Sequence, residues 1–182
     1  MAVTTLKGHV NRARDFYNKQ DIYFALGKGT PWTEADRTPA TPGRQIIDEM
    51  SPPVPMNTDE LKEPIAYKKV ETIFHVVPDD NGTLVYKDTK WKIVEPNNAI
   101  TEGARWVYIS TTVAYNEVPT NISYRQIGCY TGLRKKQGVS TGKYALLPTE
   151  VEDAGVLEVL DNRRAIYREA DQREKLVLII EF

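Results

Sequence analysis

Two glycine-bearing loops have residue types that could hold a phosphate group. Residues 27–30 (GKGT) follow an apolar run typical of a strand, and residues 138–143 (GVSTGK) come nearer to a P-loop. Backbone N–H groups of such loops bind phosphate oxygens. However, Pro31 and Trp32 directly follow the first loop, and the second loop is one residue short between its glycines, with Tyr144 where Ser or Thr would hold magnesium. We interpret both loops as flexible connectors and expect no cofactor.

Other side chains could act as acids, bases or metal ligands. His75 lies in an apolar run typical of a strand, and no Ser or Cys nucleophile can be assigned to it. Glu150, Glu152 and Asp153 cluster before a glycine, and a glycosidase needs two carboxylates placed across a sugar. Two histidines and a single cysteine, Cys129, leave few soft ligands for zinc. We expect a structural histidine, solvated carboxylates, and neither a catalytic centre nor a metal site.

The composition argues against several classes of partner. The 182 residues carry 24 basic and 25 acidic side chains, interspersed along the chain, for a net charge of −1. Proteins that bind nucleic acid or membrane surfaces usually have a clear basic patch. No apolar run has the length of a signal peptide or of a membrane span. We therefore expect a protein that stays in the cytoplasm where it is made, without a membrane or a direct nucleic-acid partner.

Short runs of β-branched and aromatic residues, separated by Gly, Pro and Asn, predict a mainly β fold. Their spacing favours an antiparallel β-sandwich, in a single domain over residues 1–182. Within residues 1–20, the segment 4–18 has apolar residues at helical spacing and predicts an N-terminal helix. Strands are predicted at residues 21–26, 65–77, 84–86, 91–94, 105–114, 123–131, 144–147, 156–160 and 175–182.

Two further predictions concern how the strands connect and pair. The Asp80-Asn81-Gly82 segment before residues 84–86 is typical of a hairpin turn, because Asn and Gly tolerate the positive φ angles that such turns need. Residues 176–180 (LVLII) are apolar on both faces, and such a strand promotes aggregation unless it is covered. We expect this last strand to lie inside a sheet that is covered on both sides.

Residues 28–64 form a Pro-rich arm that contains most of the eleven prolines. The arm is predicted to be extended and irregular, apart from a possible helical turn at residues 44–50. A loop of this length in a compact domain is often used to contact other molecules. Trp32, Pro52 and Pro53 are therefore candidate interface residues.

A second candidate interface is the basic stretch Arg134, Lys135 and Lys136, which lies between two predicted strands. Its side chains could contact phosphate or an acidic neighbour. A solvated hairpin tip is the alternative interpretation, and the sequence leaves both open.

Both ends of the chain resemble one family of structural proteins. Near the C-terminus, residues 154–175 contain a Gly-x-Leu pattern, an Asn-Arg pair and an Asp-Gln turn, and the final strand ends in Phe182. Residues 124–127 (YRQI) and the helix, strand and Pro-Trp turn within residues 16–32 are the other matching parts. These patterns resemble the baseplate wedge subunit family of contractile-tailed bacteriophages such as the T-even phages.

The resemblance implies a β-sandwich with helical or looped additions that works as a building block and not as an enzyme. It also implies a homo-oligomer whose partners are other virion tail, baseplate or neck proteins, assembled in the host cytoplasm and located in the virion tail. The most direct interpretation is a baseplate wedge protein that joins neighbouring tail subunits. A neck or collar protein at the head–tail junction is the alternative.

A function of another class is also open, a tail-associated carbohydrate-binding or lytic module. Exposed aromatic side chains such as Trp91 and Trp106 would then form a platform for sugar rings. Packing of both rings in the core is the competing interpretation. Binding or cleavage of cell-wall polysaccharide would distinguish this class from the structural one.

Overall fold

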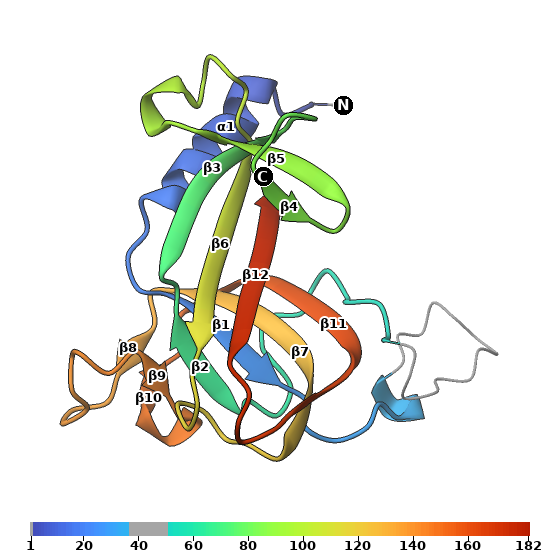
Figure 1. Ribbon diagram of the computed structural model, residues 1–182, viewed down its shortest axis with the longest axis vertical. Helices are drawn as coiled ribbons and strands as arrows, with labels where there is room; N and C mark the ends of the chain where they lie inside the picture. Colours follow the sequence, from blue (N-terminus) through green and yellow to red (C-terminus); the bar gives the residue numbers. More distant parts are fainter. Residues whose placement is uncertain (1, 37–50) are drawn as a thin grey trace. The chain divides into compact units, whose positions relative to one another are not determined.

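The structure is a computed structural model that describes residues 2–36 and 51–182, apart from the side chain of Glu34 (Figure 1). It is mostly β, with antiparallel strand pairing and a helix near the N-terminus. The predicted mainly β class, antiparallel pairing and N-terminal helix are confirmed. The packing of two sheets into a sandwich stays a prediction. The possible helical turn at residues 44–50 lies outside the described residues.

The chain divides into two compact units, each built from segments that are apart in the sequence. The first unit contains residues 1–20, 70–111 and 175–182, and the second contains residues 21–69 and 112–174. The chain therefore passes from one unit to the other four times. The single domain over residues 1–182 stays a prediction.

The first unit holds helix α1 (Leu6–Tyr17) and a five-stranded sheet with the order β12-β6-β3-β5-β4. A short 3-10 helix, η2 (Pro96–Asn98), follows β5. The strands are β3 (Thr72–Pro78), β4 (Leu84–Tyr86), β5 (Thr89–Val94), β6 (Trp106–Val113) and β12 (Glu174–Glu181).

Helix α1 begins at a side-chain cap and buries one stripe. The hydroxyl of Thr5 accepts a hydrogen bond from the N–H of Gly8 at 3.2 Å, which satisfies a free donor of the first turn. Its buried residues are Val10, Ala13 and Phe16. Val10 packs with Val94 of β5, and α1 runs beside β3 (Figure 1). The apolar stripe of the helix thus covers one face of the sheet.

The opposite face of this sheet carries an aromatic cluster. Phe74 and Val76 of β3 pair with Tyr108 and Trp106 of β6, so that all four side chains lie on one face. Val76 and Tyr108 are buried, together with Trp91 of β5. The partly buried members are Phe74, Leu84, Tyr86, Trp106, Val177 and Ile179.

The turn predicted at residues 80–82 does not form a hairpin. The N–H of Gly82 donates to the carbonyl of Asp79 at 2.8 Å, and the segment leads from β3 to β4. These two strands are not paired, because β5 lies between them. The hairpin joins β4 to β5 instead, through Lys87 and Asp88, whose φ angles are 47° and 63°. The predicted position of the hairpin is therefore wrong.

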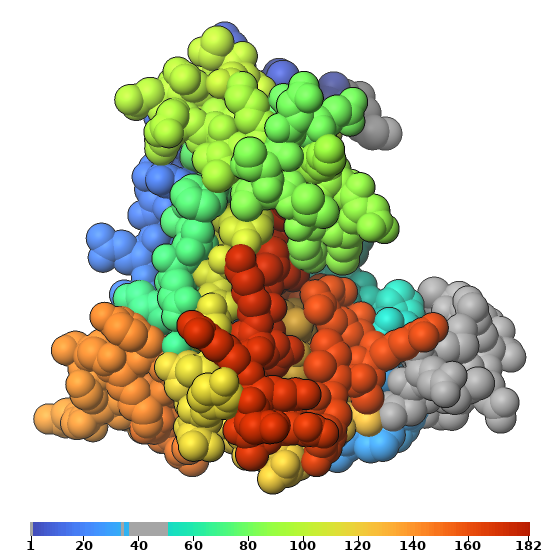
Figure 2. Space-filling view, in the orientation of Figure 1, coloured from blue at the N-terminus to red at the C-terminus, as the bar shows by residue number. Residues whose placement is uncertain are grey.

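Strand β12 lies at the edge of its sheet, beside β6. The prediction that residues 176–180 lie inside a sheet is therefore wrong. Both faces of the strand are covered nevertheless, since Leu176, Leu178 and Ile180 are buried and the alternate side chains pack on the aromatic cluster. Part of the red C-terminal segment lies at the surface in Figure 2. Strand β12 is thus apolar on both faces because both faces are covered, although the strand lies at the edge of its sheet.

The second unit holds a five-stranded sheet with the order β11-β7-β1-β2-β9 and a separate pair, β10-β8. Residues 134–135 and 151–153 had not been predicted as strands, whereas the strand predicted at 65–77 is divided between β2 and β3. The elements are β1 (Ile22–Gly27), η1 (Glu34–Asp36), β2 (Ala66–Lys69), β7 (Ile122–Thr131), β8 (Arg134–Lys135), β9 (Ala145–Leu146), η3 (Pro148–Glu150), β10 (Val151–Asp153) and β11 (Val156–Arg168).

The core of the second unit forms around β1, which pairs with β7 on one side and β2 on the other. Every residue of β1 is buried, as expected for a central strand. Tyr23 and Ala25 share a cluster with Tyr67, Tyr130 and Leu61. Leu61 belongs to the Pro-rich arm, so the arm contributes to this core.

Candidate interaction surfaces

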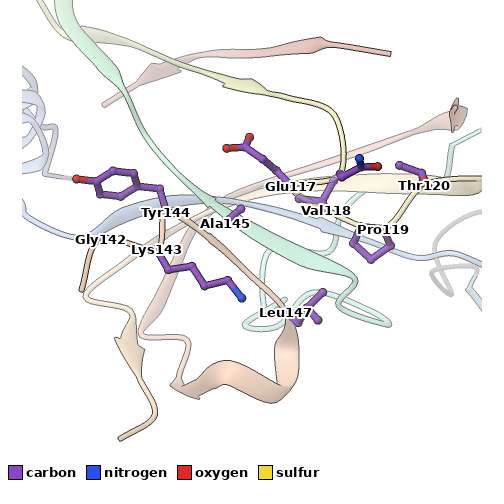
Figure 3. Close-up of a pocket in the computed structure, with 10 residues that line it drawn as sticks. Glu117, Val118, Pro119, Thr120, Gly142, Lys143, Tyr144, Ala145 and Leu147 are labelled. Carbon is purple, nitrogen blue, oxygen red and sulfur yellow. The ribbon is translucent and has the colours of Figure 1, made fainter. Parts of the chain in front are cut away.

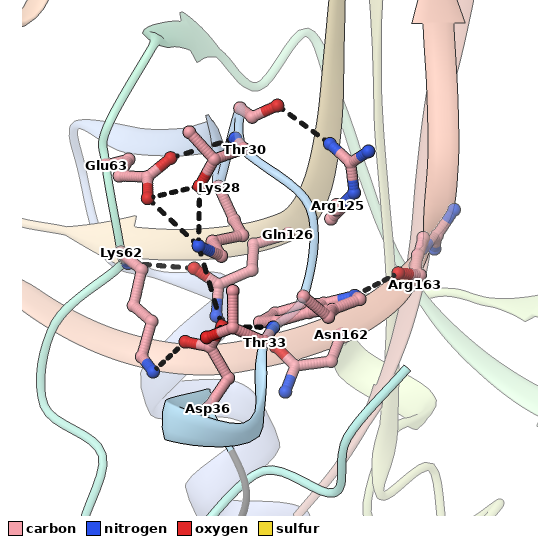
Figure 4. A network of polar contacts seen from close by, with 12 residues as sticks. Lys28, Thr30, Thr33, Asp36, Lys62, Glu63, Arg125, Gln126, Asn162 and Arg163 are labelled. Atoms are coloured by element: carbon pink, nitrogen blue, oxygen red, sulfur yellow. Dashed lines mark hydrogen bonds and ion pairs between the residues drawn. The ribbon is translucent and has the colours of Figure 1, made fainter. Parts of the chain in front are cut away.

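The first part of the Pro-rich arm is held by a buried lysine that follows β1. Lys28 is 5% exposed, and its Nζ donates to the hydroxyl of Thr30 at 2.7 Å and to Oε1 of Glu63 at 3.0 Å (Figure 4). Glu63 also accepts from the N–H of Thr30 at 3.0 Å and from its hydroxyl at 2.7 Å. The lysine and the hydroxyl of the GKGT loop thus bind a carboxylate of the same chain, and the loop joins two parts of the arm.

Two carboxylates in this network have strongly lowered pKa values. The hydrogen bond from the N–H of Thr30 is the main cause that lowers the pKa of Glu63 to about 2. Lys28 also lowers this pKa, whereas burial acts in the opposite direction. Burial opposes the ionisation of Asp36, but hydrogen bonds from Lys62 and Thr33 outweigh it and lower the pKa to about 2. The bond from Lys62 is 2.7 Å long. Both acids are therefore ionised at neutral pH and connect residues 28–36 with residues 62–63.

Trp32, Pro52 and Pro53 come together at one cavity of about 260 Å³ in the second unit. Trp32 is only 4% exposed, and its indole N–H donates to the carbonyl of Arg163 at 3.0 Å. The side-chain amide of Asn162 donates to the carbonyl of Pro52 at 2.9 Å. The arm is thus fastened to β11 at two successive residues. The role of these three residues in an interface stays a prediction, and the structure shows that Trp32 packs within its own chain.

Two polar residues of β7 also hold the arm, and sequence reasoning had not given them this role. Nη1 of Arg125 donates to the carbonyl of Gly29 at 2.7 Å. The amide of Gln126 accepts from the N–H of Lys62 and donates to Asn162, both at 2.8 Å (Figure 4). Arg125 is 4% exposed and Gln126 is 2% exposed. Two long polar residues inside an otherwise apolar strand are the signal that could have predicted a partner for them.

Arg134 and Lys135 of the basic stretch form β8, Lys136 follows it, and none of the three lines the Trp32 cavity. Arg134 makes an exposed ion pair with Asp153 at 3.0 Å. Nζ of Lys135 donates to three carbonyls of the loop that follows, those of Ser140, Thr141 and Lys143. Lys136 is exposed, and Figure 2 shows residues around 140, in orange, at the surface. Because this loop turns carbonyl oxygens towards a lysine, it is built around a cation and not as a phosphate cradle.

A larger cavity of about 670 Å³ opens in the second unit between the segment before β7 and the segment around β9 (Figure 3). Its charged side chains have partners, since both carboxylate oxygens of Glu117 accept from Lys68 at 2.9 Å and Lys143 pairs with Glu150. Tyr144 is 55% exposed and Leu147 is 40% exposed. The surface offered to a partner here therefore combines polar groups with exposed apolar side chains. The lining residues are Asn116, Glu117, Val118, Pro119, Thr120, Gly142, Lys143, Tyr144, Ala145 and Leu147.

Comparison with known proteins identifies the family. The profile of the family described as "Baseplate wedge 3 tail fiber network component" matches residues 1–182. The chain belongs to this family. "Virion protein 3" of Enterococcus phage phiEF24C is 34% identical over 190 aligned residues, which cover 100% of this chain and 96% of that protein. The resemblance of both chain ends to baseplate wedge proteins is confirmed.

Membership of the baseplate wedge 3 family establishes the broad function and the location. The chain is a structural component of the phage tail or baseplate, and it is part of the virion. Among the described residues, no helix combines the length and the apolar character needed to cross a membrane.

The remaining candidates for chemistry lie in packed surroundings. His75 is 1% exposed and stacks on Tyr17, and Cys129 is fully buried in β7. Trp91 and Trp106 meet edge to face at 5.9 Å within the aromatic cluster, as the core-packing interpretation predicts. In residues 2–36 and 51–182, no group of three or more His, Cys, Asp or Glu side chains is arranged to hold a metal ion.

Proposed function

We propose that this subunit is a baseplate wedge protein that joins neighbouring tail subunits and has no catalytic activity. The observation that carries the proposal is the match to the baseplate wedge 3 family over all 182 residues. The family description names a tail fiber network, which supports other baseplate and tail proteins as partners.

The side chains support function by contact. The residues that sequence reasoning considered for phosphate binding, such as Lys28 and Lys135, are engaged within the chain. By contrast, Tyr144 and Leu147 leave apolar surface exposed beside the 670 Å³ cavity. Aromatic and aliphatic side chains of this kind supply much of the binding energy at protein–protein interfaces.

We further propose that the subunit self-associates and does not bind nucleic acid directly. The resemblance to wedge subunits supports self-association. The net charge of −1 supports the second point, because nucleic-acid binding draws most of its affinity from an excess of basic groups.

Antibody labelling of intact virions tests the wedge role. Gold-labelled antibodies raised against the purified chain are expected at the baseplate end of the tail in electron micrographs. Preincubation with the purified chain should abolish the label. Label at the head–tail junction would instead indicate a neck or collar protein. Release of sugar fragments from cell-wall polysaccharide by the purified chain would contradict the absence of catalysis.

A further inference from the structure

A third cavity, of about 430 Å³, brings acidic and aromatic side chains together in the second unit. They come from three places, the end of the Pro-rich arm, the paired strands around the core, and β10. The residues that matter are Asp59, Glu60, Tyr67, Tyr130, Glu152 and Asp153. We call this set the acidic tyrosine pocket.

Tyr67 leaves a hydrogen-bonding group unused at this pocket. Its side chain is 5% exposed, and its ring lies edge-on to Tyr130 with centroids 5.8 Å apart. The hydroxyl of Tyr130 accepts from the N–H of Leu61 at 2.9 Å. The hydroxyl of Tyr67, by contrast, has no hydrogen-bond partner among the residues that the structure describes, although it lines the cavity. A tyrosine hydroxyl that reaches a cavity without a partner from its own chain is available to a bound molecule.

Three of the four carboxylates of the pocket carry negative charge that no ion pair within the described residues compensates. Asp59, Glu60 and Glu152 are exposed, and none of them has an ion-pair partner within residues 2–36 and 51–182. Asp153 is fixed in place by the N–H of Gly155 at 2.9 Å and by Arg134 at 3.0 Å. The pocket therefore presents three unpaired carboxylates beside two tyrosine rings.

The pKa of Tyr67 agrees with this arrangement. Burial is the main cause that raises it to about 12, and Tyr130 and Glu60 add to the effect. The phenol therefore stays neutral at physiological pH and offers an oxygen as an acceptor.

We propose that the acidic tyrosine pocket binds an arginine side chain from a virion protein other than a second copy of this chain. Guanidinium carries five donors and no acceptor, which matches a site made of carboxylates and a free phenol oxygen. Its planar group pairs with two carboxylate oxygens at once and stacks on tyrosine rings. The inference rests on the proposed function as a subunit that joins others, and it names one contact by which it does so.

Charge favours this occupant over a sugar. Sugar hydroxyls need donors as well as acceptors from the protein, whereas the charged side chains at the pocket are almost all acceptors. Carboxylates that no lysine or arginine neutralises attract a cationic partner and steer its approach.

Peptide binding to the purified full-length chain tests the proposal. The probe is a fluorescein-labelled seven-residue peptide with two arginines, and its control is the same peptide with citrulline, which keeps the shape and removes the charge. Fluorescence anisotropy should show binding of the arginine peptide and affinity for the citrulline peptide at least about tenfold lower. Equal binding of the two peptides, or no binding of either, would overturn the proposal.

Variants locate the binding site. Glu60→Gln with Glu152→Gln should weaken binding about tenfold, and Tyr67→Phe, which removes only the hydroxyl, about threefold. The matched control is Glu169→Gln with Asp171→Asn, two exposed acids in the turn before β12 that remove the same charge. An equal loss in the control would mean unspecific charge attraction and would sink the proposal.

Two further outcomes would also reject it. Self-association that disappears in Glu60→Gln/Glu152→Gln would identify a second copy of this chain as the occupant. Binding of a neutral cell-wall oligosaccharide that Tyr67→Phe abolishes would identify a sugar site. Failure of peptide binding would leave the antibody label at the baseplate unaffected, so the test is independent of the wedge role.

Discussion

The imidazole of His75 lies on β3 and stacks on the ring of Tyr17 with centroids 4.5 Å apart. Neither ring nitrogen has a hydrogen-bond partner among the described residues. Burial is the main cause that lowers the pKa of His75 below 6.5, and the charge of Arg14 acts in the same direction. The ring is therefore held neutral in the fold, where its contribution is packing of the helix against the sheet.

This histidine is expected to make the protein less stable in mild acid. The unfolded chain binds a proton at His75 near pH 6.5, whereas the folded chain binds it only at lower pH, so stability is full above pH 6.5 and declines below it. The decline cannot exceed about 1.4 kcal/mol per pH unit for one proton. Urea unfolding at pH 7.5 and pH 5.5 measures it. His75→Phe, which keeps the ring stack, should remove this decline, and an unchanged pH dependence in that variant would contradict the prediction.

At the scale of the elements, the sequence predicts where the strands lie better than it predicts which strands pair. Runs of hydrophobic residues predict β1, β5, β6 and β7, because a buried strand needs apolar side chains along its length. The Asn-Gly turn misleads because Gly82 is needed for another reason, since a Cβ there would lie 2.3 Å from the backbone of Trp91. The true hairpin uses Lys87 and Asp88, which carry no turn signal as strong as Asn-Gly.

The candidate interaction surfaces were predictable only in part, because they too depend on contacts between distant segments of the chain. The Pro-rich arm and its aromatic and proline residues can be recognised from composition, and Trp32, Pro52 and Pro53 do meet at one cavity. The ion pair that holds the arm joins Lys28 to Glu63 across 35 residues, and no local pattern encodes such a pair. The acidic tyrosine pocket likewise depends on chain folding, because its acids come from the arm and from β10.

The fastening of the arm can be tested through Glu63. Glu63→Gln should lower the free energy of unfolding by about 1 kcal/mol at pH 7, since Lys28 loses its main anion but keeps Thr30 and the more distant Asp36. The matched control is Glu102→Gln, which breaks a solvent-accessible pair with Lys92 and should lower the free energy of unfolding clearly less than Glu63→Gln does. Urea unfolding measures both.

The pH dependence of this difference is a second check on the same contact. The pKa of Glu63 falls from 4.5 in the unfolded chain to about 2 in the fold, so its contribution is complete above pH 4.5 and is lost as the pH falls towards 2. The gap between the wild-type protein and Glu63→Gln should therefore close over that range. A gap that stays constant would mean that the ionised carboxylate is not the source of the stability.

At the scale of the whole molecule, the chain crosses between the units within elements and not only in loops. β6 runs from Trp106 to Val113 across the crossing after residue 111, and β12 begins at Glu174, just before the last crossing. Buried Arg168 binds next to both crossings, since it donates to the carbonyl of Ala114 at 2.7 Å and pairs with Glu174 at 3.5 Å. The contacts of Arg168 lie within the second unit, whereas β6 and β12 contain residues of both units. Unfolding of one unit must therefore disrupt strands that continue into the other.

This continuity predicts a single cooperative unfolding transition, and the three tryptophans report it unit by unit. Trp32 lies in the second unit, and Trp91 and Trp106 lie in the first. In Trp32→Phe the fluorescence follows the first unit, in Trp91→Phe/Trp106→Phe it follows the second, and far-UV circular dichroism follows the whole chain in both. Within each variant, the fluorescence and dichroism midpoints in urea should coincide, because two-state unfolding gives the same transition by every probe. Comparing the probes inside one variant removes the effect of the substitution on stability. Separate midpoints would show that the units unfold independently, and that the strands that continue from one unit into the other do not couple them.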